Sequence, residues 1–310
     1  MKAADVSVII PTKNGGEKFP IALEKIFSYR GKYGFEVIVV DSGSTDGTIK
    51  AASRYDVRLL RIRSEEFGHG KTRNYAASIS MGKYLVFTTQ DAVPRDENWI
   101  ERLVSNFGDG RVAGIYGKQI PFDTNPYEEY FLRTAYHDQK IIKKVTEGKL
   151  ISYKEIFFSN VNSAIRRVLW ESNPFNENQI ISEDIEWAKR MLMKGYAIVY
   201  EPEAAVYHSH NYNPIKNFKR NFDLGVSLKG IIENNKRSMI KDGFNYAIRE
   251  ICYLIKEGKW RHIPYLFIYE GFRFSGFFFG RKQRYISLAL KRRLSLHSYY
   301  WKDKKVPFLF

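Results

Sequence analysis

The chain has 310 residues, a formal net charge of +16 and one cysteine, Cys252. A single cysteine excludes an internal disulfide and a multi-cysteine zinc site, and the 44% hydrophobic and 15% aromatic content excludes wholesale disorder. Residues 1–10 lack the long apolar stretch and cleavage site of a signal peptide, and no uncharged apolar run reaches the roughly 18 residues of a spanning helix. We therefore expect a folded protein that is soluble or bound to a surface.

Short apolar runs rich in β-branched residues predict buried strands at residues 6–12, 36–42, 57–62 and 84–89. Helical patterns lie between these runs, at residues 17–29, 46–55 and 70–81. Alternating strands and helices predict an α/β fold in which helices flank a mostly parallel sheet. In such sheets ligands bind beyond the carboxyl ends of the strands, so polar residues there are expected to gather at one edge.

The second half of the sequence changes character at about residue 214. Before it we predict strands at 112–119 and 157–165, helices at 126–140 and 183–194, and short strands at 196–200 and 204–207. After it we predict three or four helices with breaks near Asp242-Gly243, Gly258 and Gly280. We therefore expect two domains, an α/β domain over residues 1–213 and a helical region over residues 214–310.

Charge and aromatic residues are concentrated in the second of these regions. Residues 1–213 hold 29 lysines and arginines against 27 acidic residues, whereas residues 214–310 hold 21 against 7 and carry 20 of the 48 aromatic residues. A basic, aromatic region suits nucleic acid, anionic lipid headgroups or a polyanionic substrate. An ordinary helical core with a solvated basic face is the alternative, and the sequence leaves this open.

Polar side chains end or follow three of the predicted strands. Asp41 ends one strand before a turn of glycine and serine, where a carboxylate can accept hydrogen bonds from a nucleobase or ribose, or can simply cap the turn. Asp91 ends another strand and is a hard oxygen ligand suited to magnesium or manganese, although such residues also occur in plain turns. His208 and His210 follow a short strand, and an imidazole there can complete a metal site with Asp91.

Two predicted helix starts also carry candidate groups. Asp184 begins the helix at 183–194, where it is either a general base or a carboxylate placed for the helix dipole. Residues 67–74 combine a glycine turn with Lys71 and Arg73, which suits a diphosphate clamp or an ordinary helix start. Neither GxGxxG nor GxxxxGK[ST] occurs, so a dinucleotide or P-loop site is not expected.

Several stretches together resemble one family. VSVIIPTKN and VIVVDSGSTDGT resemble the nucleotide-binding half of family 2 glycosyltransferases of the GT-A fold. EEFGHGKTRNYAA and YLVFTTQDAVP are similar to its bacterial rhamnosyltransferase-type members, and SEDIEWAKRMLMKGY and VYHSHNY resemble the block that carries the catalytic base and a metal-binding histidine. The end, GRKQRYISLALKRRLSLHSYYW, also resembles those rhamnosyltransferases, so the likeness covers nearly the whole chain.

The resemblance implies an inverting, metal-dependent transferase that uses Mn²⁺ or Mg²⁺. The sugar is expected to be L-rhamnose from dTDP-L-rhamnose. The expected acceptor is a growing cell-surface glycan or a lipid-linked oligosaccharide. It implies that Asp184 is the base and that Asp91 and His208 hold the ion. The family's Asp-x-Asp is here Thr89-Gln90-Asp91, so we expect the ion to enter mainly with the nucleotide. The implied donor residues are Pro11, Thr12, Asn14, Asp41, Ser42, Ser44, Gly70, Lys71, Arg73, Asn74, Gln90 and Asp91, and the implied acceptor residues are Asn160, Asn162, Glu183 and Trp187.

The aromatic stretch at 263–279 and the basic clusters after it suit peripheral membrane association through residues 259–310, at the cytoplasmic face of the membrane. The same aromatics also suit a helical bundle or the seam of a homodimer. Alternatives to a rhamnosyltransferase are a family 2 enzyme for another UDP-, GDP- or dTDP-sugar, a nucleotidyltransferase and a catalytically silent scaffold. A nucleic-acid-binding protein is a further alternative that we do not expect, because the charge is confined to the tail and no nucleic-acid module is recognised.

Overall fold

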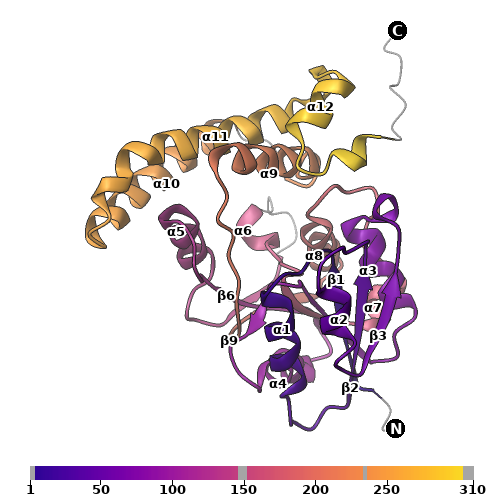
Figure 1. Cartoon of the computed structure of the whole chain (residues 1–310). Helices are drawn as coiled ribbons and strands as arrows, with labels where there is room; N and C mark the ends of the chain where they lie inside the picture. The colour runs from indigo at the N-terminus through magenta and orange to yellow at the C-terminus, as the bar shows by residue number, and fades with distance from the viewer. Residues whose placement is uncertain (1–3, 146–151, 233–235, 303–310) are drawn as a thin grey trace. The chain divides into compact units, whose positions relative to one another are not determined.

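The computed structural model describes residues 4–145, 152–232 and 236–302, and it shows two compact units (Figure 1). The first unit comprises Met1–Phe122, Ala135–Gln179 and Glu183–His208. The second unit comprises Asp123–Thr134, Ile180–Ser182 and Ser209–Phe310. Residues 123–134, which we expected with the α/β domain, thus group with the C-terminal helices.

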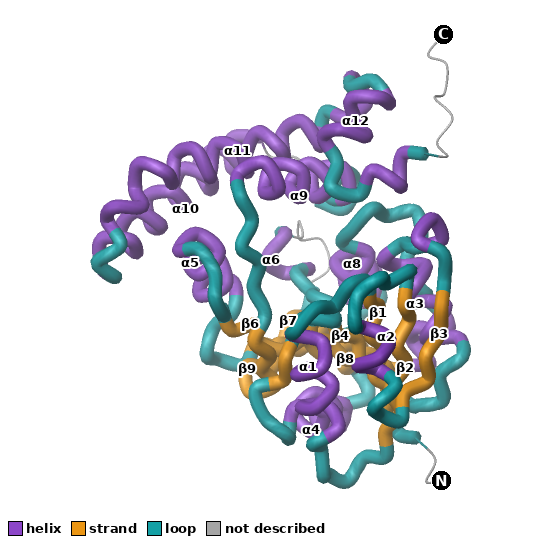
Figure 2. Tube along the Cα trace, in the orientation of Figure 1, coloured by secondary structure: helices purple, strands orange, loops and turns teal. Residues whose placement is uncertain are grey.

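The first unit is built on one sheet, drawn as orange tube in Figure 2. Its strand order is β3-β2-β1-β4-β8-β6-β9-β5, with β7 paired to β9. The bounds are β1 Val6–Thr12, β2 Phe35–Asp41, β3 Val57–Arg61, β4 Tyr84–Thr88, β5 Val93–Pro94, β6 Val112–Ile120, β7 Ile141–Lys143, β8 Asn162–Arg166 and β9 Ala197–Tyr207.

Strands β1 to β4 are parallel, whereas β8 runs antiparallel to both β4 and β6. In the β1–β2 register Thr12 lies opposite Asp41, so both strands end at the same level. Connections between parallel strands must cross over the sheet, which places the intervening helices on its faces. The carboxyl ends of β1, β2 and β4 therefore meet at one edge, as the sequence predicts.

Helices cover both faces of this sheet. On one face Phe19 of α1 (Lys18–Phe27) and Trp99 of α4 (Trp99–Val104) join Val8 of β1 in a buried cluster. On the other face Phe87 of β4 packs edge-on against Phe175, which in turn contacts Trp187 of α8 (Glu183–Met193). Because side chains alternate along a strand, β-branched runs such as β1 bury both faces at once.

The first unit also contains α2 (Thr48–Ala52), α3 (His69–Ser78), α6 (Tyr153–Ile156) and α7 (Arg167–Ser172). Within the second unit, α5 (Pro126–Ala135) accompanies α9 (Pro214–Ser227), α10 (Lys236–Lys256), α11 (Ile263–Arg281) and α12 (Leu288–Leu294).

Helices α9 and α11 of the second unit run side by side (Figure 1). Two glycines on α11 permit their close approach, because a Cβ on Gly276 would lie 2.3 Å from the carbonyl oxygen of Phe218 and one on Gly280 would lie 2.1 Å from that of Phe222. Any larger side chain would force these helices apart. Among the described helices, none combines the length and apolar character needed to cross a bilayer.

Four local predictions differ from the structure. The helix predicted at 126–140 ends at Ala135, and β7 follows it; the strand predicted at 157–165 begins only at Asn162. The two short strands predicted around Pro202 form the single strand β9, which accommodates the proline through a register shift against β6. The break predicted at Asp242-Gly243 is wrong because α10 continues through it; a Cβ on Gly243 would lie 2.8 Å from the ring of Phe274, so packing explains this glycine.

Candidate active site

The ends of β1, β2 and β4 are joined by side-chain hydrogen bonds. The Thr12 hydroxyl and the backbone N–H of Lys13 both donate to Gln90 Oε1 at 2.7 Å. The backbone N–H of Asn14 donates to Ser44 Oγ at 2.8 Å. Three segments that are far apart in the sequence thus form one polar edge, where the expected donor residues were placed.

Asp41 is the buried carboxylate of this edge. It is 2% exposed and accepts hydrogen bonds from the backbone N–H groups of Gly43 and Ser44, both at 3.1 Å. Gly43 has a φ of +92°, a conformation that glycine adopts without strain. Ser42 is equally buried and its hydroxyl donates to the Thr12 carbonyl at 3.2 Å. Asp41 therefore organises the turn, and its contact with a nucleoside stays a prediction.

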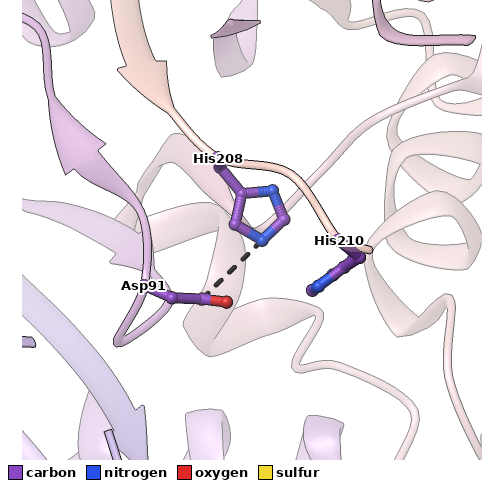
Figure 3. A group of neighbouring side chains, drawn as sticks. All are labelled: Asp91, His208 and His210. Carbon is purple, nitrogen blue, oxygen red and sulfur yellow. Dashed lines mark ion pairs between the residues drawn. The ribbon is translucent and has the colours of Figure 1, made fainter. Parts of the chain in front are cut away.

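Asp91, His208 and His210 offer ligand atoms that all lie within 4.8 Å of one another (Figure 3). His208 Nε2 is 3.7 Å from Asp91 Oδ1, too far for a direct hydrogen bond. Imidazole nitrogen with carboxylate oxygen is a donor set that binds first-row divalent metals such as manganese. The residues present therefore fit a divalent ion, with His210 added to the pair expected from the sequence.

A buried glutamine orients His208. Gln119 Oε1 lies 2.8 Å from His208 Nδ1, while Gln119 Nε2 donates to Ser159 Oγ at 3.0 Å and to the Tyr136 hydroxyl. With Gln119 held in this orientation its oxygen accepts the Nδ1 proton, which leaves the Nε2 lone pair directed at Asp91. Such outer partners fix the tautomer and ring orientation of metal-binding histidines.

Asp184 is the second residue of α8 and is held by backbone donors. The N–H of Asn160 donates to its Oδ2 at 2.9 Å, and the N–H of Ile185 donates to Oδ1 at 2.8 Å. Burial, followed by repulsion from Glu183, nevertheless raises the pKa of Asp184 to about 7. A carboxylate with a pKa near neutrality is well matched to general-base chemistry.

Glu183 and Arg73 form a buried ion pair beside Asp184. Arg73 NH1 lies 2.8 Å from Glu183 Oε1, and both side chains are about 5% exposed or less. Asn160 Nδ2 also donates to Glu183 Oε1, at 3.3 Å. Since Asn160 follows Ser159 in the chain, a continuous path of contacts runs from His208 through Gln119 to Asp184. Arg73 and Glu183 support this site, and direct contact of either with substrate stays a prediction.

Four expected site residues are instead engaged in packing. The indole of Trp187 is fully buried and donates to the Asn173 carbonyl at 2.9 Å, so it cannot contact an acceptor. Asn162 is also fully buried. Its side-chain amide accepts a hydrogen bond from the Trp99 indole and donates to the carbonyl oxygens of Lys118 and Ala204. Because it too is enclosed, its assignment to the acceptor is corrected. The Asn74 amide is hydrogen-bonded to Trp170, Phe175 and Glu177. A Cβ on Gly70 would lie 2.8 Å from the Asn176 carbonyl oxygen. Both residues therefore serve the packing of α3.

Lys71 is exposed and lines a pocket of about 730 Å³ in the first unit. The strand-end residues Thr12, Asp41 and Gln90 do not line this pocket. Its other lining residues are Arg61, Ile62, Glu66, Thr72, Asn74, Tyr75, Ser78, Trp170, Pro174, Phe175 and Glu177. We therefore do not assign it to the donor, and a diphosphate contact of Lys71 stays a prediction.

Sequence reasoning missed Gln119, and of the two histidines it named beside Asp91 it kept only His208 in the expected pair of metal ligands. A signal for His210 was present, because residues two apart in extended chain point to the same side. Gln119 carried a weaker signal, a polar residue near the end of a mostly apolar strand. Its partner His208 lies 89 residues away, and no local pattern reports such a pairing.

The chain is similar to known glycosyltransferases. Residues 7–172 match the family model described as glycosyl transferase family 2. The chain is 34% identical over 302 residues to the O-antigen chain rhamnosyltransferase WbaN of Salmonella anatum, with 96% of each chain covered. It is 33% identical over 304 residues to the O-antigen chain rhamnosyltransferase RfbN of Salmonella typhimurium strain LT2, again with 96% of each covered.

A solved structure supports the fold assignment. The mannosyltransferase PcManGT from Pyrobaculum calidifontis, in complex with GDP-Man and Mn²⁺, aligns with a TM-score of 0.62 and 17% identity, over 90% of this chain and 87% of that one. At this identity the likeness concerns the fold alone. It confirms the expected GT-A-type α/β architecture with helices flanking a mostly parallel sheet.

Proposed function

The chain belongs to glycosyl transferase family 2, and from that premise we propose that it transfers L-rhamnose from dTDP-L-rhamnose, with inversion, onto a hydroxyl of a growing cell-surface glycan or lipid-linked oligosaccharide. The family makes the chain a glycosyltransferase. The choice of sugar and acceptor is supported by two O-antigen rhamnosyltransferases that match it over nearly their whole length. The observation that carries the proposal is the path of contacts linking His208, Gln119, Asn160 and Asp184.

Asp184 is the general base of this proposal. Its carboxylate takes the proton of the acceptor hydroxyl while that oxygen forms a bond to the anomeric carbon. The bond from this carbon to the diphosphate oxygen breaks on the opposite face, which inverts the configuration. Such assistance is typically worth about 10²–10⁴-fold in rate. The backbone N–H of Asn160 holds the carboxylate, and the side-chain amide of Asn160 is in turn bonded to Glu183, the partner of Arg73.

The strand-end edge is the proposed donor site. Asp41, Thr12 and Ser44 lie where a nucleoside binds in open α/β sheets, beyond the carboxyl ends of the strands. The hydrogen bonds among Thr12, Gln90, Asn14 and Ser44 keep this edge preformed. Binding would then need little rearrangement of the backbone.

Asp91 and His208, together with His210, are the proposed ligands of Mn²⁺ or Mg²⁺. Such an ion, when bound, supplies positive charge that stabilises the departing diphosphate. Gln119 and its partners Tyr136 and Ser159 keep the His208 lone pair available. Because Thr89 stands where the family motif has its first carboxylate, we expect weak binding of the ion without nucleotide.

The exposed aromatic face of α11 is the proposed membrane-surface contact. Phe267 and Phe278 are 63% and 59% exposed, and their spacing of three helical turns places them on one side of the helix. Lys291, Arg292 and Arg293 follow on α12. Aromatic side chains flanked by cations suit the interface of an anionic bilayer. Since a charged nucleotide sugar does not cross a bilayer, we place the enzyme on the cytoplasmic face, with its donor.

A donor screen tests the proposal. Purified full-length protein with Mn²⁺ would be given dTDP-L-rhamnose, UDP-glucose, UDP-galactose or GDP-mannose together with a lipid-linked oligosaccharide fraction, and the released nucleotide and the glycan product would be quantified. We expect product with dTDP-L-rhamnose and at least tenfold less with the others. Faster transfer from another donor would replace the sugar assignment, and no transfer from any of them would contradict the function.

A further inference from the structure

A second, smaller cavity lies wholly within the second unit, and none of its lining residues is among those assigned to the donor, the metal ion or the base. It has a volume of about 230 Å³. Its lining consists of four tyrosines and three asparagines and includes no charged side chain: Asn125, Tyr127, Asn211, Tyr212, Asn213, Tyr265 and Tyr269. In a chain of net charge +16 this neutral lining favours an uncharged ligand.

Aromatic rings form one wall of this cavity. Tyr127 and Tyr269 are buried and stacked, with ring centroids 4.7 Å apart. Tyr265 lies with its ring 6.0 Å from that of Tyr127 and keeps 45% of its surface exposed. A rigid buried pair therefore supports a tyrosine that presents ring surface to solvent. Rings that combine an apolar body with a polar tip are well suited to amphipathic ligands.

Asparagine side chains form the polar part of the cavity lining. Asn125 Oδ1 accepts the N–H groups of Tyr127 and Glu128 at the start of α5, and its Nδ2 donates to Asn211 Oδ1 at 3.2 Å. Asn213 Oδ1 accepts the N–H of Lys216 at 2.9 Å at the start of α9. Among the described residues, neither the Asn211 nor the Asn213 Nδ2 group has a partner of its own. These two amides are thus positioned by their oxygens and left with donors to offer.

The same hydrogen bonds argue against an anion. Two helix N-termini lie beside the cavity, and such ends bind phosphate through their open N–H groups. Here Asn125 and Asn213 already occupy N–H groups at these ends, and no lysine or arginine lines the cavity. A neutral ligand with one apolar face and several hydroxyls matches the lining better than a phosphate does.

We propose that this cavity binds a single pyranose ring of the acceptor glycan, with the C–H face of the sugar on Tyr265 and its hydroxyls bonded to Asn211 and Asn213. The proposal rests on the proposed transfer to a glycan. Pockets for drug-sized ligands usually measure about 300–1,000 Å³, so the smaller volume suits one ring rather than an oligosaccharide. Asn211 follows His208 by three residues, and at 3.8 Å per residue their Cα atoms are at most about 11 Å apart.

Saturation-transfer NMR on the full-length chain tests this assignment. The probes are methyl α-D-mannopyranoside, methyl α-D-galactopyranoside and methyl α-L-rhamnopyranoside, with excess dTDP present to occupy the donor site. We expect at least one glycoside to give a signal that falls fivefold or more in Asn211→Ala and in Tyr265→Ala. Phe267→Ala is the matched control, because Phe267 is an exposed aromatic residue of the same helix that does not line the cavity. Thermal melts would establish that each variant is folded.

Three outcomes with the glycosides overturn the proposal: no glycoside binds the wild type, the two cavity variants bind as the wild type does, or Phe267→Ala loses as much signal. Binding of tetramethylammonium in place of the glycosides would mark a cation cage and would also overturn it. The transfer assay separates this idea from the function. A tenfold rise in the acceptor KM of Tyr265→Ala supports both the sugar-binding role of the cavity and the proposed transfer. An unchanged KM contradicts only the role of the cavity. Glycoside binding without rhamnosyl transfer contradicts only the proposed function.

Discussion

Gln119 Oε1 lies 2.8 Å from His208 Nδ1, and this contact determines which imidazole nitrogen faces Asp91. Gln119→Leu removes the acceptor, so we expect Mn²⁺ affinity in the presence of dTDP to fall by about 10–100-fold, the usual effect of losing an outer partner. Gln119→Glu keeps an oxygen at the same position and should stay within about threefold of the wild type by the same reasoning. Calorimetric titration measures both variants. Wild-type affinity in a folded Gln119→Leu protein would show that this contact does not tune the site.

Asp184→Asn removes the proposed base while keeping the shape of the side chain. Turnover should fall by about 10²–10⁴-fold, whereas dTDP binding should change less than twofold. In the wild type, activity should rise with pH to a plateau with a midpoint near 7, because the raised pKa of Asp184 leaves it protonated below that value. Single-turnover assays between pH 5 and 9 measure both effects. A variant that keeps a tenth of wild-type turnover would show that the base is another residue.

The buried pair of Arg73 and Glu183 predicts an asymmetric response to mutation. Glu183→Ala leaves the Arg73 guanidinium buried without its partner, and the free energy of unfolding should drop by about 3–5 kcal/mol. The double variant Arg73→Met with Glu183→Leu should recover much of this loss, since apolar replacement of a buried pair is often neutral. Denaturant unfolding of the three proteins tests the prediction. A loss below about 1 kcal/mol in Glu183→Ala would mean that water reaches the arginine.

Glu250 on α10 predicts a pH dependence of stability. Its side chain is buried, and burial followed by repulsion from Glu270 raises its pKa to about 8, against the opposing effect of Arg273. The folded state therefore holds a proton that the unfolded chain releases near its ordinary pKa. The resulting stabilisation is complete below about pH 4.5 and is lost as the pH rises through 8.

We therefore expect Glu250→Gln to melt at a higher temperature than the wild type at pH 9, with a difference that shrinks toward pH 5. Glu257→Gln, at an exposed position just beyond α10, is the control and should match the wild type throughout. Melting curves at several pH values give the comparison. If the melting temperatures of the wild type and Glu250→Gln change with pH in parallel, Glu250 is ionised in the folded state.

The exposed face of α11 predicts membrane binding. Phe267→Glu combined with Phe278→Glu replaces two exposed aromatic residues by anions, so flotation with vesicles containing phosphatidylglycerol should fall at least fivefold. Tyr75→Glu, an exposed aromatic position on α3, serves as the control. Vesicles of phosphatidylcholine alone should bind the wild type weakly. Equal flotation of all three proteins would exclude this face and leave a bundle or dimer seam as its role.

Local patterns in the sequence determined much of the fold and the location of the site. The strand at Val6–Thr12 is confirmed at both ends, because its β-branched run is buried on both faces of a sheet whatever lies around it. Asp41 and Asp91 were located by a similar argument, since a strand's own apolar pattern tells where it ends. The helix at 126–140 was overestimated because nothing local reports that β7 pairs with β9.

The tertiary structure decided the roles of individual side chains. Arg73 and Glu183 are 110 residues apart, and only folding converts an expected diphosphate ligand and an acceptor ligand into a buried pair. Trp187 looks accessible on a helix next to the base, yet its indole is enclosed between Phe158 and Phe175. Residue type sets what a group can bind, whereas burial and partners set what it does bind. Burial and partners depend on contacts between distant segments. For this reason the sequence located the site, whereas the fold decided the role of each side chain in it.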